Sequence, residues 1–322
     1  MATYIGIKGI EIQTIAGDPA NPVVGQVWYN TTTNTLKGRR SAVSDGAWAS
    51  APAVNTGRTH AAGTGTQTAS IWAGGYAAPL TLDKSETYDG SSWSEGNDIN
   101  TARRTYHMGA GTVTAALIAG GYTPGGSVAN AETYDGTCWT ATTALTTARY
   151  TQGGGTQTAA LAISGEASTG LTTFVEEWNG STWTEKADVN TAVRRAPAVG
   201  TTTAALKFAG NPGYFDLTEQ FDGTTWTEVA DLNTGRVDPA AAGTSTLALC
   251  YGGAPYGSKT ESWDGTSWTE LANMATARQG LGGGTNLQSA ALGMGGTQSG
   301  GAHLTATEAW SVADATKTFT SS

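Results

Sequence analysis

The sequence predicts an all-β protein, a six-bladed β-propeller with four strands in each blade. The first observation behind this prediction is a tryptophan that recurs six times, at intervals of 42 to 46 residues. The second is the turn before it, where Asp-Gly or Asn-Gly precedes a strand-like run, which is a strong hairpin signal. Periods of about 40 to 50 residues with several short strands are typical of propeller blades.

Composition agrees with a turn-rich β protein. The 322 residues include 45 Gly and 11 Trp, and only 13% are charged, which argues against a helical fold. The net charge of −9 would repel a phosphate backbone or an anionic membrane, so we expect no nucleic acid partner and no membrane insertion. Only Arg39-Arg40, Arg103-Arg104 and Arg194-Arg195 approach a basic patch. Cys138 and Cys250 are too few for a disulfide framework.

Each repeat unit has the same parts in the same order. An arginine opens the unit, a small-residue strand follows, and a second apolar strand stops at a glycine pair. After a variable loop come a strand with Glu, one residue and an aromatic, then the Asp-Gly turn and the Trp strand. The recurring positions are Arg58, Arg103, Arg149, Arg194 or Arg195, Arg236 and Arg278; Glu86, Glu132, Glu176, Glu219, Glu261 and Glu308; and Trp48, Trp93, Trp139, Trp183, Trp226 and Trp268.

The double glycine, the aromatic-Asp pair, the later Trp and the boundary Arg resemble kelch repeats, and the resemblance covers residues 41–311. The glycine pair weakens to Ser164-Gly165 and Ala209-Gly210, and the last unit lacks its Trp strand. The segment 45–50 is a Trp strand without the rest of a unit, because no Gly-Gly strand precedes its Trp. We therefore expect this segment to complete the last blade and close the ring, which removes exposed sheet edges.

The recurring residues have structural interpretations. A buried Trp removes about 150 to 250 Å2 of surface from water, so we expect each one to wedge between neighbouring sheets. A charged side chain is seldom fully buried unless it is paired. The arginines and glutamates therefore predict one buried or half-buried ion pair in each unit, with no catalytic role.

The repeated turn is similar to the sialidase turn Ser-x-Asp-x-Gly-x-Thr-Trp, but Asp89 lies four residues before Trp93, one fewer than in that motif. A resemblance to that family would imply catalysis by a convergent arginine cluster, an acid and a nucleophilic Tyr-Glu pair. Here we expect nearly every arginine outside the N-terminal region at the repeat position, which leaves no spare cluster. Asp83, Asp216 and Asp238 depart from the repeat and are interpreted as solvated loop acids, with a hydrolytic carboxylate pair as the alternative.

The three histidines, His60, His107 and His303, are too few and too separated for a metal triad. We expect surface or channel-lining roles for them. The sequence thus predicts no catalytic residue, no metal and no cofactor.

The segments that differ between units should cluster on one face, since they are equivalent loops. They carry or adjoin Tyr76, Tyr122, Tyr214, Phe215 and Tyr256. This composition suits a surface that stacks on sugars or binds a protein. Solvated loops with incidental aromatic residues are the alternative.

Residues 1–40 do not fit the repeat. YIGIKGIEIQ alternates isoleucines as a strand would, and a hairpin is expected around Asn30 to Asn34. The stretch 25–37, GQVWYNTTTNTLK, is similar to a short motif of bacteriophage tail and fibre proteins. We expect an attachment or oligomerisation arm at 1–40, a propeller at 41–311 and a C-terminal tail at 312–322. No secretory signal pattern is recognised in MATYIGIKGI.

These features together predict a non-enzymatic structural protein of a bacteriophage virion, a tail, fibre or decoration component assembled in the host cytoplasm. Residues 1–40 would bind other virion proteins, the chain would form a homo-oligomer within the particle, and the propeller loops would bind a host surface glycan or protein. One alternative is a sialidase-like or lyase-like propeller that acts on surface polysaccharide. Another is a kelch-type protein-interaction scaffold.

Overall fold

A computed structural model describes residues 12–23, 25–255, 257–284 and 286–319, apart from the side chains of 40–45 and 313–317. Strands, turns and loops make up these residues, and none of them forms a helix that could cross a membrane. The chain divides into two compact units, residues 47–311 and residues 1–46 with 312–322. Strand β29 (Thr307–Phe319) runs through most of the segment expected as a tail.

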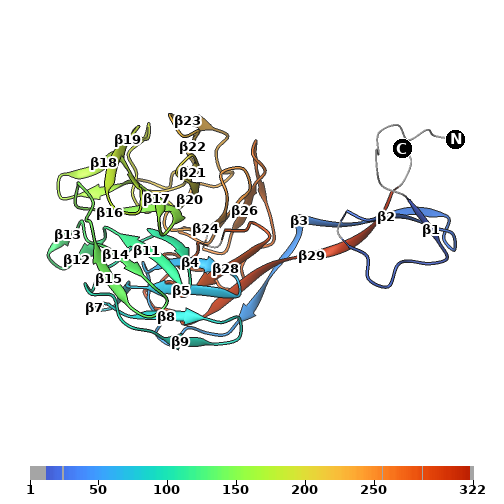
Figure 1. Cartoon of the computed structure of the whole chain (residues 1–322), viewed down its shortest axis with the longest axis horizontal. Coiled ribbons are helices and arrows are strands. Elements are labelled where there is room, and N and C mark those ends of the chain that lie inside the picture. The colour runs from blue at the N-terminus through green and yellow to red at the C-terminus, as the bar shows by residue number, and fades with distance from the viewer. Residues whose placement is uncertain (1–11, 24, 256, 285, 320–322) are drawn as a thin grey trace. The chain divides into compact units, whose positions relative to one another are not determined.

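Five sheets have four strands each, joined antiparallel in the order in which they follow along the chain (Figure 1). The first is β4 (Ala62–Thr66), β5 (Ala69–Ala73), β8 (Ser85–Tyr88) and β9 (Trp93–Glu95). The second is β10 (Gly109–Thr112), β11 (Ala115–Ala119), β14 (Ala131–Tyr134) and β15 (Trp139–Thr142). The third is β16 (Arg149–Thr156), β17 (Ala159–Ala167), β18 (Gly170–Trp178) and β19 (Trp183–Lys186). The fourth is β20 (Ala198–Thr201), β21 (Ala204–Phe208), β22 (Thr218–Phe221) and β23 (Trp226–Val229). The fifth is β24 (Ala240–Gly243), β25 (Ala248–Tyr251), β26 (Thr260–Trp263) and β27 (Trp268–Glu270).

A sixth sheet joins the two ends of the repeat region. Its strand order is β1-β2-β3-β29-β28, with β28 at Ala290–Met294 and β3 at Thr35–Ala51. Gly282 adds an antiparallel bridge to Met294 where the other sheets have a full first strand. The segment 45–50 thus lies within β3, hydrogen-bonded beside the last repeat's β29.

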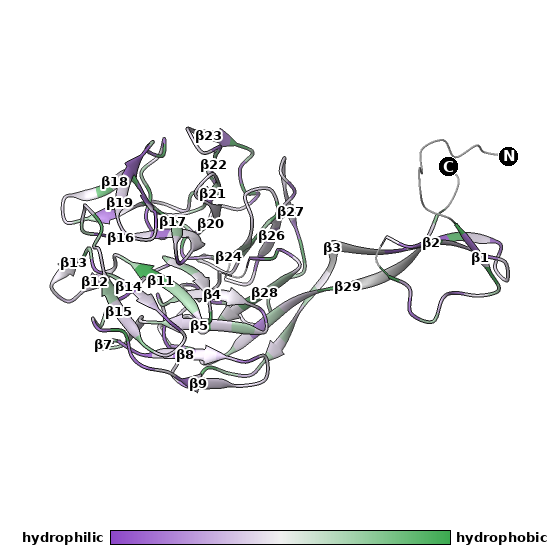
Figure 2. Ribbon diagram, in the orientation of Figure 1, coloured by the Kyte–Doolittle hydropathy of each residue, from purple (hydrophilic) through white to green (hydrophobic). Residues whose placement is uncertain are grey.

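The first strands of the five four-stranded sheets, together with β28 of the sixth sheet, contact one another in sequence order. β4 contacts β10, β10 contacts β16, β16 contacts β20, β20 contacts β24, β24 contacts β28, and β28 contacts β4. Glycines suit this crowded position, because a Cβ added at Gly109 would lie 2.8 Å from the carbonyl oxygen of Gly63 in the neighbouring sheet. The strands between the first and the outer ones hold the apolar core, as the hydrophobic colour on β11 shows in Figure 2.

The glycine pair follows the second strand in most of the sheets, and both of its residues have a left-handed backbone; in β17 the equivalent Ser164-Gly165 lies inside the strand, at an irregularity of the register. Gly74 and Gly75 have φ values of 70° and 109°, a conformation that costs glycine little. Ser164 and Ala209 replace the first glycine in two repeats and keep the same backbone, with φ values of 53° and 65°. The Ser164 hydroxyl donates to the Thr172 carbonyl oxygen at 2.8 Å, which ties this strained position to its surroundings.

The turn 88–93 joins β8 to β9. The Asp89 carboxylate accepts hydrogen bonds from the backbone N–H of Ser91 at 2.8 Å and of Ser92 at 2.7 Å. Across the turn Tyr88 pairs with Trp93, and their rings stack at 5.0 Å. The Trp93 indole donates to the Pro52 carbonyl oxygen at 3.0 Å, beyond its own sheet, as the wedge interpretation expects.

The smaller unit contains β1 (Gln13–Ile15), β2 (Val27–Asn30) and the first part of β3. Its hairpin turns at 31–34, where Asn34 has a φ of 53°. Asp18 accepts from the buried Trp28 at 3.1 Å and from Lys37 at 2.9 Å. Most of the strand expected in YIGIKGIEIQ lies outside the described residues.

Candidate functional site

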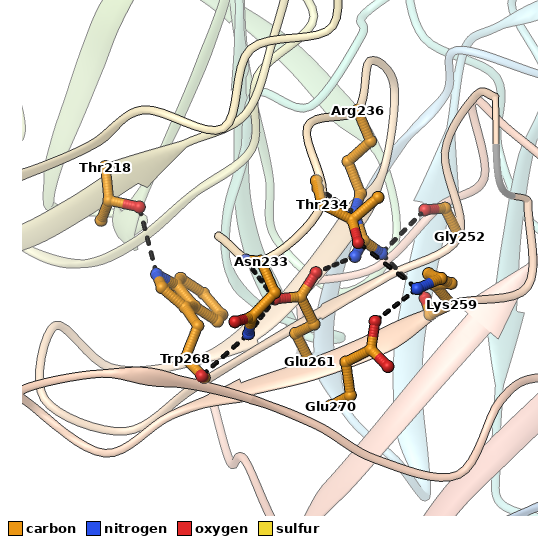
Figure 3. A network of polar contacts seen from close by, with 9 residues as sticks. All are labelled: Thr218, Asn233, Thr234, Arg236, Gly252, Lys259, Glu261, Trp268 and Glu270. Carbon is orange, nitrogen blue, oxygen red and sulfur yellow. Dashed lines mark hydrogen bonds and ion pairs between the residues drawn. The ribbon is translucent and has the colours of Figure 1, made fainter. Parts of the chain in front are cut away.

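Five repeats contain a buried arginine paired with the glutamate of the third strand. The pairs are Arg58–Glu86, Arg103–Glu132, Arg149–Glu176, Arg236–Glu261 and Arg278–Glu308. Figure 3 shows one of them with its surroundings: the Glu261 carboxylate also accepts from the backbone N–H of Asn233 at 2.8 Å, and Asn233 donates to the Trp268 carbonyl oxygen at 2.9 Å. The Glu261 carboxylate therefore pairs with a buried arginine and also holds the loop at Asn233, which in turn is hydrogen-bonded to the Trp268 strand. These contacts give the ion pair a structural role.

The fourth repeat departs from this pattern. The expectation that Arg194 or Arg195 would occupy the repeat position is wrong, because Val193 occupies it: its carbonyl oxygen accepts from Gly165 as that of Arg149 accepts from Gly121. The glutamate of this repeat is instead paired with Lys207, at 2.7 Å from Nζ to Oε1. Neither Arg194 nor Arg195 therefore takes part in the buried ion pair of this repeat.

Arg194 and Arg195 line a pocket together with Arg104. We call this the arginine pocket; its volume is about 480 Å3, and its lining residues are Arg104, Tyr106, Tyr122, Gly126, Ser127, Tyr150, Glu166, Ala167, Ser168, Arg194 and Arg195. The size lies within the range of small-ligand sites. The expectation that no spare arginine cluster remains is therefore wrong.

One wall of the arginine pocket is a hydrogen-bonded triad. The Tyr150 hydroxyl donates to Oε2 of Glu166, and Arg194 is ion-paired with the same carboxylate. Nη1 of Arg194 also donates to the Tyr150 hydroxyl at 3.0 Å. The Tyr106 ring stacks on Tyr150 with centroids 4.5 Å apart, which fixes the orientation of the phenol. The triad can present one hydroxyl and one guanidinium to a ligand.

Arg104 forms another part of the lining. The Arg104 guanidinium lies 3.8 Å from the centroid of the Tyr76 ring and 5.8 Å from that of Tyr122. Among the described residues it forms no ion pair with a carboxylate. An arginine stacked on tyrosine keeps its in-plane N–H groups available for a ligand.

Arg195 joins the arginine pocket to a buried acid. Nη1 of Arg195 lies 3.1 Å from Oδ2 of Asp238, and Nε2 of His60 lies 3.2 Å from the same oxygen. Burial alone would raise the pKa of Asp238, but His60, His107 and the Arg195 guanidinium hold it well below its usual range. Burial lowers the pKa of His60, and Asp238 offsets this only in part. The interpretation of Asp238 as a solvated loop acid is wrong, since its side chain is 2% exposed.

His107 lies 3.8 Å from Oδ1 of Asp238 and also lines a small central cavity of about 40 Å3. First strands from all the sheets contribute glycine or alanine backbone to this cavity, with Gly63, Gly109 and Gly154 among them. Within the described residues no group of His, Cys, Asp and Glu side chains is suited to hold a metal ion. His303 lies apart from Asp238, with its ring 5.7 Å from Tyr76.

The aromatic residues expected on the recognition face are distributed unevenly. Tyr122 lines the arginine pocket, and Tyr76 lies under Arg104 at its edge. Tyr214 is 55% exposed and belongs to another part of the loop face, with Phe215 beside it. Tyr256 lies outside the described residues. Of the expected residues that the structure describes, Tyr122 alone lines the arginine pocket, and Tyr76 contacts it through Arg104.

Comparison with known proteins bears on the fold. No protein-family model matches the chain, and no curated protein matches it by sequence. Among solved structures it is similar to a propeller-type protein titled "Structure of YjhT", with a TM-score of 0.68 and 12% identity over 82% of this chain and 99% of that one. The chain has a β-propeller fold. At this identity the likeness extends to the fold alone, so the arginine pocket of the propeller must be interpreted from its own residues.

Proposed function

We propose that this propeller is a non-enzymatic recognition protein whose arginine pocket binds a carboxylate-bearing glycan. The observation that supports it is the convergence of Arg104, Arg194 and Arg195, none of which belongs to the repeated buried ion pairs. Planar guanidinium groups match the geometry of a carboxylate, and the tyrosines beside them offer faces for a sugar ring.

The charge balance of the arginine pocket favours an anion. The pocket has three guanidinium groups, of which Arg194 is paired with Glu166 and Arg195 with Asp238, and Arg104 leaves one positive charge in excess. This excess is local, because the chain as a whole carries −9. A cationic pocket on an acidic protein concentrates small anions while the remaining surface repels polyanions such as nucleic acids.

We also infer that the repeats form six blades and that β3 closes the ring beside β29. The contacts that run through the first strands from β4 to β24, then to β28 of the sixth sheet and from β28 back to β4, support this inference. So does the shared central cavity. A closed ring would hold the loops that carry Arg104 and Arg194 at a fixed separation, as a preformed pocket requires.

The setting that we propose is a bacteriophage virion, in which residues 1–40 bind other virion proteins and the propeller binds the host surface. The resemblance of residues 25–37 to tail and fibre motifs supports it, together with the separate compact unit formed around β2. Labelling the chain with gold and imaging purified particles by electron microscopy tests this setting. Label on particles supports it, and label confined to the cell fraction contradicts it.

Isothermal titration calorimetry with matched sugars tests the binding function. Galacturonate and glucuronate should bind, whereas galactose and glucose should bind far more weakly. Replacing Arg194 by Met should weaken uronate binding roughly tenfold to a hundredfold, since a hydrogen bond to a charged group contributes about 1.5–3 kcal/mol. The control Lys84→Met removes a cation on the exposed surface and should leave binding unchanged. Equal affinity for neutral and acidic sugars would contradict the proposal.

A second candidate function is cleavage of an acidic polysaccharide. The hydrogen bond between Tyr150 and Glu166 favours it, because a phenol beside a carboxylate can act as a nucleophile or a proton donor. Incubating the chain with polygalacturonate and measuring new reducing ends and unsaturated products separates the two functions. Product release that Tyr150→Phe abolishes would make the protein an enzyme.

A further inference from the structure

Asp238 belongs to a chain of residues from successive repeats that are joined by backbone hydrogen bonds. The backbone N–H of Tyr106 donates to His60, His60 to Gly280, Gly280 to Asp238, and Asp238 to Arg195, at 2.9–3.0 Å. All five have a left-handed backbone, with φ between 48° and 60°. Gly280 makes the same backbone bonds with no side chain, so the fold does not need a carboxylate at this position.

Burying the Asp238 carboxylate in this backbone conformation nevertheless lowers the stability of the fold. Non-glycine residues in the left-handed region are strained, and such strain gathers at functional sites. Nε of Arg195 is buried without a hydrogen-bond partner among the described residues, and Oδ1 of Asp238 and Nε2 of His107 lie 3.8 Å apart, beyond hydrogen-bond distance. Unpaired buried polar atoms destabilise a fold. The fold does not need the Asp238 carboxylate, and its burial is unfavourable. We therefore look for its role outside the core.

The contacts of Asp238 indicate that role. Its Oδ2 accepts from Nη1 of Arg195 at 3.1 Å and from Nε2 of His60 at 3.2 Å, so the carboxylate is held from inside the propeller. The Arg195 side chain is 32% exposed and lines the arginine pocket, with its guanidinium 5.8 Å from the Tyr106 ring centroid. A half-exposed arginine without such an anchor would sample many rotamers.

We infer that Asp238 is a positioning residue, which orients the Arg195 guanidinium in the arginine pocket, while His60 supports the carboxylate from the side away from the ligand. The role in ligand binding rests on the proposed function, whereas the orientation of Arg195 does not. Nη1 of Arg195 is hydrogen-bonded to Asp238 and Nε is buried, so Nη2 is the nitrogen that remains for the ligand carboxylate.

Arginine modification of the full chain by phenylglyoxal, followed residue by residue by mass spectrometry, tests the orientation without any ligand. Asp238→Asn removes the charge, and Asp238→Gly removes the side chain; both residues tolerate a left-handed backbone. Each should speed modification of Arg195 roughly tenfold, as expected for losing a hydrogen bond between charged groups, with little change at Arg194. The control Asp216→Asn changes an exposed acid of the loop face and should have no effect. An unchanged rate at Arg195 in both variants would overturn the inference.

A double-mutant cycle on galacturonate affinity tests the link to binding. Asp238→Asn should weaken binding in the native background and have almost no further effect beside Arg195→Asn, because it acts through that arginine. Equal losses in both backgrounds would overturn the inference. If the native chain binds no galacturonate while Arg195 still responds to Asp238→Asn, the proposed function fails and the positioning role stands.

Discussion

Nζ of Lys207 lies 2.7 Å from Oε1 of Glu219, and both side chains are 1% exposed. The two residues are directly opposite on β21 and β22, so the strand register brings them together. Burial lowers the pKa of Lys207, while the charge of Glu219 raises it. The lysine thus replaces the arginine that the other repeats place before their first strand or, as Arg149 in β16, at its first residue.

Replacing Lys207 by Met should destabilise the propeller by about 3–5 kcal/mol, since it leaves Glu219 as an unpaired buried charge. Urea unfolding followed by tryptophan fluorescence measures the loss. Lys84→Met, which breaks the exposed pair with Asp98, is the control and should change little. A small loss for Lys207→Met would show that the pair with Glu219 contributes little to the stability of the propeller.

An arginine at position 193 should rescue the missing lysine. Val193 occupies the place that Arg149 and Arg236 hold in other repeats, so Val193→Arg combined with Lys207→Ala rebuilds the common pair with Glu219. The double variant should regain most of the stability that Lys207→Ala alone loses, as measured by the same urea midpoint. A double variant less stable than Lys207→Ala would mean that this repeat cannot accommodate the guanidinium.

The sequence predicted the repeated parts well because their signals are local. The Asp-Gly turn, the glycine pair and the alternation of Glu86 with Tyr88 each act within a few residues, so spacing alone locates the strands. The assignment of Arg194 to the repeat failed because Val193 and Lys207 share that role across two strands. A lysine within an otherwise apolar strand was the available signal.

The arginine pocket could not be predicted from spacing, because it joins residues from different repeats. The available sequence signal for this pocket was the pair of adjacent arginines at 103–104 and at 194–195. The buried ion pair needs at most one arginine in each repeat, so the second arginine of each pair is left for another role. The burial of Asp238 cannot be predicted from its neighbours in the sequence, because nothing local indicates that its side chain lies inside the protein. Only the meeting of first strands around the central cavity places it beside His60.

Trp48 should be as important for stability as the tryptophans inside the repeats. Its indole donates to Oγ1 of Thr260 at 2.9 Å, and its ring lies 4.9 Å from Tyr251 and 5.6 Å from Trp310. Trp48→Ala should destabilise the propeller by about 3 kcal/mol. Trp28→Ala, in the smaller unit, is the matched control and should leave the propeller's unfolding transition in place. If Trp48→Ala were neutral and removal of residues 1–50 left a cooperative transition, closure by β3 would be excluded.

His60 should make stability fall at mildly acidic pH. Its folded pKa is lowered from 6.5 by burial, so the unfolded chain binds the proton more readily. The stabilisation from this group is complete above pH 6.5 and is lost as pH falls below that value. His60→Asn, which suits the left-handed backbone, should remove this part of the decline between pH 7.5 and pH 5 in urea unfolding. An identical decline in the variant would mean that His60 does not titrate there.

The turn 88–93 provides an internal comparison between Asp89 and its equivalent Asp135. The hydrogen bond from the Ser91 hydroxyl, with backbone N–H groups of Ser91 and Ser92, lowers the pKa of Asp89 from 3.8 to about 2. Asp135 is lowered mainly by the backbone N–H groups of Cys138 and Thr137. Ser91→Ala should therefore raise the pKa of Asp89 toward that of Asp135, which carboxyl NMR titration measures. Because the folded pKa is depressed, the turn's contribution to stability is present above pH 3.8 and is lost as pH falls toward 2. An Asp89 midpoint that does not move in Ser91→Ala would show that the backbone N–H groups alone hold the turn.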